Sequence, residues 1–282
     1  MCSSVKTGQQ KPPKSYKDLE FLNSPDARLV RILAEFLGPQ RRFRLEQIRD
    51  TIVFFGSARI VPKQQALREY RELRRKARGN GGTRKGLTDA MQRAAVKVDM
   101  SRYYEDTVEL ARRLTLWSKS LDTQRRFVVC SGGGPGIMEA ANKGASLARG
   151  KSIGMNISLP FEQFANPYIS PKLSLEFHYF FMRKFWFAYL AKALVIMPGG
   201  FGTVDELMEM LTLHQTNKVT KKVGIVLYGS EYWKNTLDFD YMIARGVINR
   251  KDLNLFRYYD DVDSAFTYLR DFLTRHYAGK HA

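Results

Sequence analysis

Two glycine-rich segments contain residues that could bind a phosphate and act on the molecule that carries it. Each follows a short apolar run: Phe127–Cys130 leads into SGGGPGIMEAANKGA, residues 131–145, and Ala193–Met197 leads into PGGFGTVDEL, residues 198–207. Glycines let backbone N–H groups approach a phosphate closely, and a following helix presents unpaired amides and its positive dipole end. We therefore predict a strand, a phosphate-binding turn and a helix in both places.

The glycines of both turns are the predicted phosphate-binding residues. They are Gly132, Gly133, Gly134 and Gly136 in the first turn and Gly199, Gly200 and Gly202 in the second. One such turn is weak evidence, because glycine-rich turns also serve to pack a helix on a sheet. Two turns at neighbouring strand ends could converge on one site, since ligands of open parallel sheets bind where the strand order reverses.

Polar side chains near the turns are further candidates. Thr203 offers a hydroxyl donor, Glu206 lies in the first turn of the second predicted helix, and Glu139 occupies the equivalent place after the first glycine turn. A helix dipole favours an acid at such a position with or without catalysis, so both interpretations stay open for the two glutamates. Glu139 could bind a ribose hydroxyl. Glu209 shares a helical face with Glu206 and could be a second carboxylate, although acids on helices are usually surface residues.

The elements that must position these residues follow an α/β pattern. Apolar runs at residues 51–55, 127–130, 152–157, 193–197 and 223–227 are predicted strands, with a weaker one at 173–177, and most are separated by helix-length segments. Continuous rather than alternating apolar runs indicate parallel strands buried on both faces. We predict a Rossmann-like, doubly wound, mainly parallel sheet with helices on both faces.

One domain is expected over residues 21–282, preceded by a disordered, Pro/Lys-rich tail over residues 1–20. A helix beginning near Ser24-Pro25 is predicted to end at Gly38-Pro39. Residues 61–100 are predicted to form a basic helical insertion or extended hairpin. It has a helix near residues 64–78 and a turn over residues 79–82.

The chain carries 46 Lys and Arg against 28 Asp and Glu, a formal net charge of +18. Residues 63–97 contribute 11 basic and 3 acidic side chains to that total. A positive field attracts phosphate-bearing molecules, so an anionic partner is expected. The two cysteines form no disulfide framework, the four histidines have no metal-ligand spacing, and no apolar run reaches the length of a membrane span. These features predict a cytoplasmic protein without a metal site.

The segments GGGPGIMEAAN from Gly132 and PGGFGTVDE from Pro198 resemble the paired signatures of the LOG (Lonely Guy) family. The resemblance runs from about Thr51 to Leu273. It includes FFGSAR from Phe54, GMNI from Gly154, FEQ from Phe161, NPY from Asn166 and FMRK from Phe181. Members are nucleoside 5′-monophosphate phosphoribohydrolases that are often mislabelled lysine decarboxylases.

The resemblance implies roles for individual residues. It implies that Glu206 and Arg183 are catalytic and that the glycine turns bind the 5′-phosphate. Lys184 is then an electrostatic neighbour of Arg183, and Ser57 and Asn156, which follow or end predicted strands, could reach the same crevice. Breaking an N-glycosidic bond builds positive charge on the ribose, which a carboxylate at Glu206 could stabilise while it activates water.

The substrate base is less constrained than the phosphate. The chain has Gly136-Ile137-Met138-Glu139 where compact plant-type members read GLMG, and residues 63–97 are extra relative to those members. It is more similar to the longer bacterial members, which implies an AMP-like substrate without a cofactor. A cytokinin riboside 5′-monophosphate is the alternative substrate. The resemblance also implies a homodimer or higher homo-oligomer, with the aromatic segment near residues 179–191 as a candidate contact.

Three other functions compete with hydrolysis of a nucleotide. A lysine decarboxylase would need a lysine to anchor pyridoxal phosphate, and no segment argues for one. A dinucleotide-dependent oxidoreductase would have an acid at the end of the strand after the glycine turn, but that strand ends near Asn156. A non-catalytic nucleotide or nucleic-acid binder that uses residues 63–97 remains an alternative, although charge runs are usually solvated surfaces.

Overall fold

A seven-stranded parallel sheet forms the centre of the computed structural model, which describes residues 12–79, 84–121, 126–159 and 164–278. Its strand order is β4-β3-β2-β1-β5-β6-β7, and every neighbouring pair is parallel. The strands are β1 (Thr51–Phe55), β2 (Val128–Ser131), β3 (Ser152–Ile157), β4 (Ser174–Phe177), β5 (Ala191–Ile196), β6 (Gly224–Tyr228) and β7 (Arg257–Tyr259). The predicted Rossmann-like parallel sheet is confirmed.

The predicted strands match the observed ones closely. β1 and β3 have the predicted bounds, and the other four predicted strands differ by one or two residues at an end. β7 escaped prediction because it is a three-residue edge strand, Arg-Tyr-Tyr, that pairs with β6 on one side. Such a short polar segment carries no apolar run to detect.

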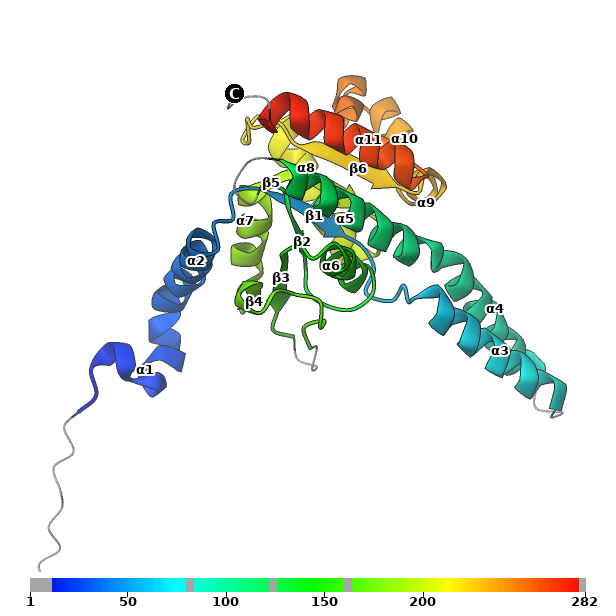
Figure 1. Ribbon diagram of the computed structural model, residues 1–282, viewed down its shortest axis with the longest axis horizontal. Coiled ribbons are helices and arrows are strands. Elements are labelled where there is room, and N and C mark those ends of the chain that lie inside the picture. The colour runs from blue at the N-terminus through cyan, green and yellow to red at the C-terminus, as the bar shows by residue number, and fades with distance from the viewer. Residues whose placement is uncertain (1–11, 80–83, 122–125, 160–163, 279–282) are drawn as a thin grey trace, which may run out of the picture.

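Helices cover both faces of the sheet (Figure 1). One face packs against α5 (Arg102–Ser120), α6 (Ile137–Leu147) and α11 (Val262–Leu273), which share one hydrophobic cluster with the strands. The other face packs against a set of helices from both ends of the chain. These are α2 (Arg28–Leu45), α7 (Phe180–Leu190), α8 (Phe201–Gln215), α9 (Ser230–Thr236) and α10 (Phe239–Ala244).

Helix α2 does not end at Gly38-Pro39, as the sequence suggested, but continues to Leu45. Proline lacks the N–H that would bond to the carbonyl four residues earlier, here that of Glu35. In the structure this carbonyl accepts a hydrogen bond of 3.1 Å from Nε1 of Trp186 on α7. The neighbouring helix therefore replaces the missing bond, and Pro39 is tolerated inside α2.

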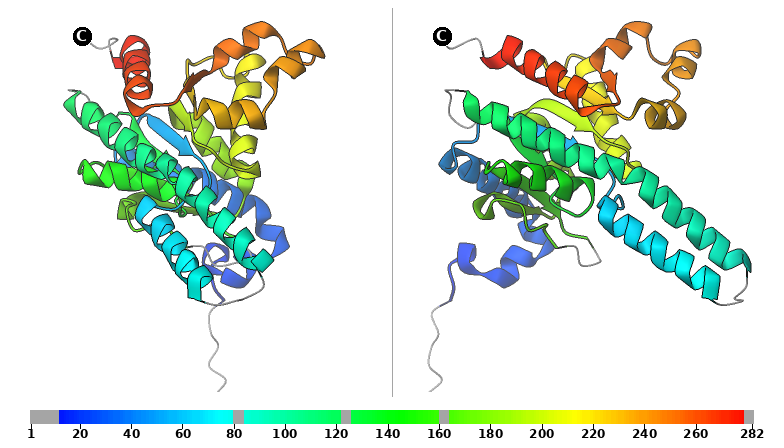
Figure 2. Two further views of the ribbon diagram at one scale, coloured as in Figure 1. Left: turned by 90° about the vertical axis from the view of Figure 1, so that its right-hand side faces the viewer. Right: turned by 45° about the vertical axis from the view of Figure 1, so that its right-hand side comes forward.

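Residues 61–100 contain a two-helix hairpin formed by α3 (Lys63–Gly79) and α4 (Arg84–Met100). The two helices pack on each other, and together they extend away from the sheet as an arm (Figures 1 and 2). Ala66 and Ala94 are buried, whereas most of the basic side chains that the structure describes are exposed. Most of the turn predicted over residues 79–82 lies outside the described residues.

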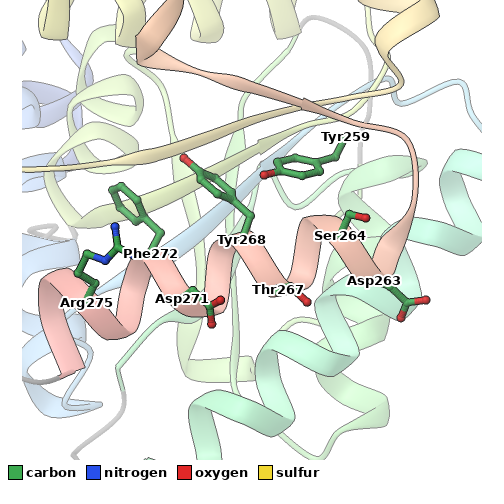
Figure 3. Close-up of a pocket in the computed structure, with 8 residues that line it drawn as sticks. All are labelled: Tyr259, Asp263, Ser264, Thr267, Tyr268, Asp271, Phe272 and Arg275. Carbon is green, nitrogen blue, oxygen red and sulfur yellow. The ribbon is translucent and has the colours of Figure 1, made fainter.

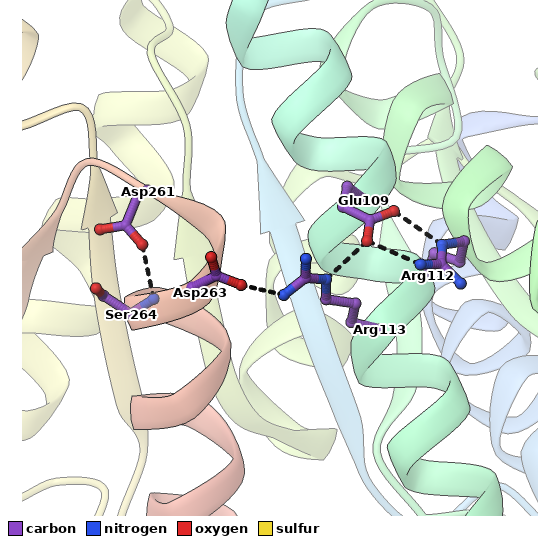
Figure 4. Close-up of polar contacts among 6 residues, drawn as sticks. All are labelled: Glu109, Arg112, Arg113, Asp261, Asp263 and Ser264. Atoms are coloured by element: carbon purple, nitrogen blue, oxygen red, sulfur yellow. Dashed lines mark hydrogen bonds and ion pairs between the residues drawn. The ribbon is translucent and has the colours of Figure 1, made fainter.

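Helix α11 is attached to α5 by charged side chains (Figure 4). Arg113 on α5 pairs with Asp263 of α11 and also with Glu109, one turn earlier on its own helix, at 2.7 Å. The N-terminus of α11 is capped by Asp261, whose carboxylate accepts a hydrogen bond of 2.8 Å from the amide of Ser264. These contacts fix the last helix beside α5 and the sheet.

Before α2, the chain forms a 3₁₀ turn at Ser15–Lys17 and the short helix α1 (Leu19–Asn23). The rest of the tail predicted over residues 1–20 lies mainly in residues 1–11, which are not described. In the described part of the chain, no helix is long and apolar enough to cross a membrane.

Candidate active site at the carboxyl ends of β1, β2 and β5

The two glycine turns lie on either side of the central strand β1. The chain passes from β1 to β2 and outward to β4, then returns to β5 on the opposite side, so the strand order reverses at β1. Ser57, just after β1, joins the turns through its backbone: its amide donates to the carbonyl of Pro198 at 3.0 Å, and its carbonyl accepts from the amide of Ile137 at 3.1 Å. The two turns therefore converge at the switch point, where ligands of such sheets bind.

The first turn is tightly packed. A Cβ added at Gly132 would lie 2.6 Å from Sδ of Met138, and one at Gly133 would lie 2.6 Å from the side-chain amide of Asn156. Gly136 has φ +69°, and its Cβ would lie 2.4 Å from the carbonyl oxygen of Ser57. These glycines are required because other parts of the protein approach the backbone closely.

Buried polar side chains also support the first turn. The amide of Gly133 donates to Oγ of Ser131 at 3.0 Å, and Nδ2 of Asn166 donates to the carbonyls of Gly133 and Gly134 at 3.0 and 3.1 Å. With its amide nitrogen turned toward the loop, Asn156 donates to the carbonyls of Gly132 and Gly133 at 3.3 and 3.2 Å. Because the amide of Gly133 donates to Ser131, it is already hydrogen-bonded within the protein and is not available to a ligand.

The second turn is more open. A Cβ added at Gly200 or Gly202 would meet no atom of the described residues within 4 Å, whereas one at Gly199 would collide with Thr203. Among the described residues, the amides of Gly200, Phe201 and Gly202 donate to no backbone carbonyl, as is usual at a helix N-terminus. The carbonyl of Gly199 is held by the hydroxyl of Tyr232 on α9 at 2.9 Å. An anion could reach these amides without displacing protein atoms.

Arg183 on α7 and Glu206 on α8 face each other beside the turns. Nη2 of Arg183 lies 3.9 Å from Oε1 of Glu206, and their side chains are 16% and 6% exposed. Nε of Arg183 is buried and has no hydrogen-bond partner among the residues that the structure describes, while its guanidinium lies over the rings of Phe180 and Phe187. The pair is loosely bonded, so both groups keep bonding capacity for a ligand.

Burial raises the pKa of Glu206 to about 7, although the positive charges of Arg183 and Lys184 lower it and the nearby carboxylates of Glu209 and Asp205 raise it. Burial also lowers the pKa of Arg183, against the charges of Glu206 and Asp205. A carboxyl group that titrates near neutral pH can both accept and return a proton, as a general acid–base catalyst must.

Lys184 is also part of this charged cluster. Its ammonium lies 2.9 Å from Asp205 and 3.0 Å from Glu209, and these bonds raise its pKa against the effect of its burial. Glu209 thus lies near Glu206, but it is paired with Lys184 and is 34% exposed. Glu139 lies elsewhere in the first turn of α6, where it accepts a hydrogen bond of 2.8 Å from the hydroxyl of the buried Tyr104.

Sequence reasoning missed three residues that shape the site. Asn166 supports the first turn, although it belongs to the NPY segment that carried part of the resemblance. Asp205 directly precedes Glu206 and could have been found as a partner for Lys184. Tyr232 lies 33 residues after Gly199, beyond helix α8 and strand β6, and no sequence pattern linked the two residues.

Other candidate sites lie apart from this one. A cavity of about 600 Å³ lies beside α11 at the β7 edge of the sheet, lined by residues such as Tyr259, Tyr268 and Arg275 (Figure 3). No cluster of three or more potential metal ligands occurs among the described residues. FEQ, the segment of residues 161–163 that carried part of the resemblance, lies outside the described residues.

Comparison with known proteins gives related matches in sequence and in structure. A family model described as "Possible lysine decarboxylase" matches residues 138–269. A probable cytokinin riboside 5′-monophosphate phosphoribohydrolase, LOG4 of Oryza sativa subsp. japonica, is 29% identical over 156 residues, which cover 54% of this chain and 66% of that protein. Two structures of the molybdenum cofactor carrier protein of Chlamydomonas reinhardtii align with TM-scores of 0.42 and 0.44. They are 19% and 17% identical and cover 61% and 80% of this chain, and 89% and 99% of their own.

Proposed function

We propose that the chain is a LOG-family enzyme that hydrolyses the N-glycosidic bond of a nucleoside 5′-monophosphate. The products are the free base and ribose 5-phosphate. The observation that carries the proposal is the buried Arg183–Glu206 pair beside the open N-terminus of α8, with a carboxyl group whose pKa is about 7.

Glu206 acts on the ribose in this proposal. As the bond between C1′ and the base nitrogen breaks, positive charge develops on the ribose, and the Glu206 carboxylate stabilises it. The same carboxylate accepts a proton from the water that forms the new C1′–O bond. The base leaves with the bonding electron pair and takes up a proton, which the protonated Glu206 or solvent supplies.

Arg183 positions the substrate for this reaction. Its guanidinium is held by the rings of Phe180 and Phe187, yet Nε has no partner in the described structure. A guanidinium so placed can form a bidentate pair with a phosphate or with Glu206 and so fix the ribose relative to the carboxylate. The amides of Gly200 and Gly202 bind the 5′-phosphate from the other side.

The test is a panel of AMP, GMP, CMP, UMP and a cytokinin riboside 5′-monophosphate, with assays for ribose 5-phosphate and free base. We expect AMP to be cleaved, and Glu206→Gln to lower kcat by roughly a thousandfold, within the range for removal of a general acid–base group. Glu231→Gln, which alters an exposed acid on α9, is the matched control and should retain activity. Release no greater than that of the Glu206→Gln variant across the panel would refute the hydrolase.

We also propose that the protein is a homodimer that buries the exposed apolar side chains of α2 and α7. These helices pack on each other, and Leu29, Leu33, Phe181 and Tyr189 are between 51% and 73% exposed. Single apolar residues at a surface are ordinary, but a contiguous set across two packed helices is typical of a protein interface. Light scattering should give twice the chain mass, and Leu33→Glu with Tyr189→Glu should give the monomer. A wild-type monomer at working concentration would contradict the dimer.

A further inference from the structure

A cavity of about 530 Å³ lies between the second glycine turn and helix α4 of the hairpin. Ser57, Gly199 and Gly200 form part of one wall, at the switch point of the sheet. Side chains of α4 form the opposite wall. Neither Glu206 nor Arg183 lines this hairpin cavity, so it adjoins the proposed catalytic pair without containing it.

The charged side chains around the hairpin cavity are all positive. They are Arg59, Arg93 and Lys97, and no carboxylate occurs among the lining residues that the structure describes. Lys97 is paired with Glu69 on α3 at 2.7 Å. Arg59 and Arg93 form no ion pair with any carboxylate in the described part of the chain, so two guanidinium groups are available to an anion.

The backbone around the cavity favours the same kind of ligand. Gly200, which lines it, is the N-cap of the 15-residue helix α8, whose positive dipole end lies at this point. Ile60, Val96 and Met100 supply an apolar surface that suits a ring or a sugar. The volume is within the range of small-molecule sites, about 300–1,000 Å³.

We propose that the hairpin cavity is a phosphate-binding subsite in which Arg59 and Arg93 hold a phosphoryl group against the N-terminus of α8. Guanidinium groups suit this role because their paired N–H donors match two phosphate oxygens. The phosphoryl group belongs either to the nucleotide substrate or to a second phosphorylated molecule. The proposed function supplies the identity of the substrate, but phosphate binding at Arg59 and Arg93 does not depend on cleavage.

Titration calorimetry of the full chain in phosphate-free buffer tests the subsite, with inorganic phosphate and AMP as separate probes. AMP is titrated into proteins that also carry Glu206→Gln, so that cleavage does not interfere. We expect Arg59→Gln and Arg93→Gln each to weaken phosphate binding about tenfold, as for loss of one charged hydrogen-bonded pair. Arg93→Lys should recover part of the affinity. Arg75→Gln, an exposed change on α3 outside the cavity, should have no effect.

The pattern across the two probes identifies the source of the phosphoryl group. If Arg93→Gln weakens AMP and inorganic phosphate in parallel, the subsite holds the phosphate of the substrate. If it weakens inorganic phosphate alone, the subsite serves a second molecule. Unchanged phosphate affinity in the Arg59→Gln/Arg93→Gln double variant, with an unchanged melting temperature, would overturn the inference. Failure of the proposed function is distinct, because the wild type would then bind phosphate without releasing ribose 5-phosphate from any nucleotide.

Discussion

The first glycine turn is packed on several sides, whereas the second faces open space where its helix begins. At Gly132, Gly133 and Gly136 an added Cβ would lie 2.4–2.6 Å from protein atoms, but at Gly200 and Gly202 no atom in the described part of the chain lies within 4 Å of it. Glycine permits both close packing and close approach of a ligand. Glycine therefore has a different role in the two similar motifs. In the first turn it lets helix α6 pack against the loop after β1, and in the second turn it leaves backbone amides accessible.

The acids that follow the two turns differ in the same way. Glu139, after the first turn, accepts a hydrogen bond from Tyr104 of the protein itself. The Glu206 side chain, after the second turn, is 6% exposed and lies near the guanidinium of Arg183, whose Nε has no partner among the described residues. In the proposed function, the second turn therefore carries the chemistry and the first turn fixes the geometry around it.

The largest effect expected from this contrast is on stability. Gly136→Ala should lower the free energy of unfolding by about 4 kcal/mol, because φ is positive and the new Cβ would press on the backbone of Ser57. Gly202→Ala is the matched change in the second turn. It should leave stability within about 1 kcal/mol, because alanine has space there and favours a helix. Urea unfolding followed by circular dichroism measures both.

A larger loss of stability in Gly202→Ala than in Gly136→Ala would contradict this comparison of the two turns. If Gly202→Ala were as damaging as Gly136→Ala, the second turn would also be a packing element and its amides would not be accessible. An intact Gly202→Ala variant that binds inorganic phosphate more weakly than the wild type would sharpen the comparison, since only the binding role would then have changed.

The sequence was sufficient to predict the sheet because the buried parallel strands are continuous apolar runs. β1, Thr51–Phe55, is buried at all five positions and was predicted with its observed bounds. The prediction was wrong for the end of α2, because local rules treat Pro39 as a stop. The bond from Trp186 that rescues the helix joins residues far apart in the chain, so no local pattern could reveal it.

The sequence motifs predicted which residues gather at the candidate site, but not which of the two glycine turns is packed and which is open. The motifs located both turns, Glu206 and Arg183, and the structure places the two charged residues opposite each other. Nothing in GGGPG or PGGFG shows which glycines are packed, because that depends on Met138, Asn156 and Ser57 in the folded protein. The cavity beside α4 was equally invisible, since the hairpin's approach to the second turn is a tertiary contact.

The pH dependence of stability tests whether the second turn carries the titrating group. Burial raises the pKa of Glu206 to about 7 from an ordinary value of 4.5. Well below pH 4.5 the carboxyl group is protonated in both the native and the unfolded state, so its burial does not make the free energy of unfolding depend on pH. As the pH rises to 7, the unfolded chain releases this proton first, so the free energy of unfolding falls. The fall should reach about 3 kcal/mol above pH 7, since a tenfold change in an acid's ionisation constant corresponds to roughly 1.4 kcal/mol.

Glu206→Gln removes this titration, so the stability of the wild type relative to that variant should decrease by about 3 kcal/mol between pH 4.5 and pH 8. Gly202→Ala alters the same helix without removing a titratable group, and its stability should follow the wild type across the same range. Denaturant unfolding at closely spaced pH values measures the three proteins. A constant difference between the wild type and Glu206→Gln would mean that the pKa of Glu206 is the same in the native and the unfolded protein, so the buried carboxyl group would be ionised near neutral pH and would hold no proton to give to the leaving base.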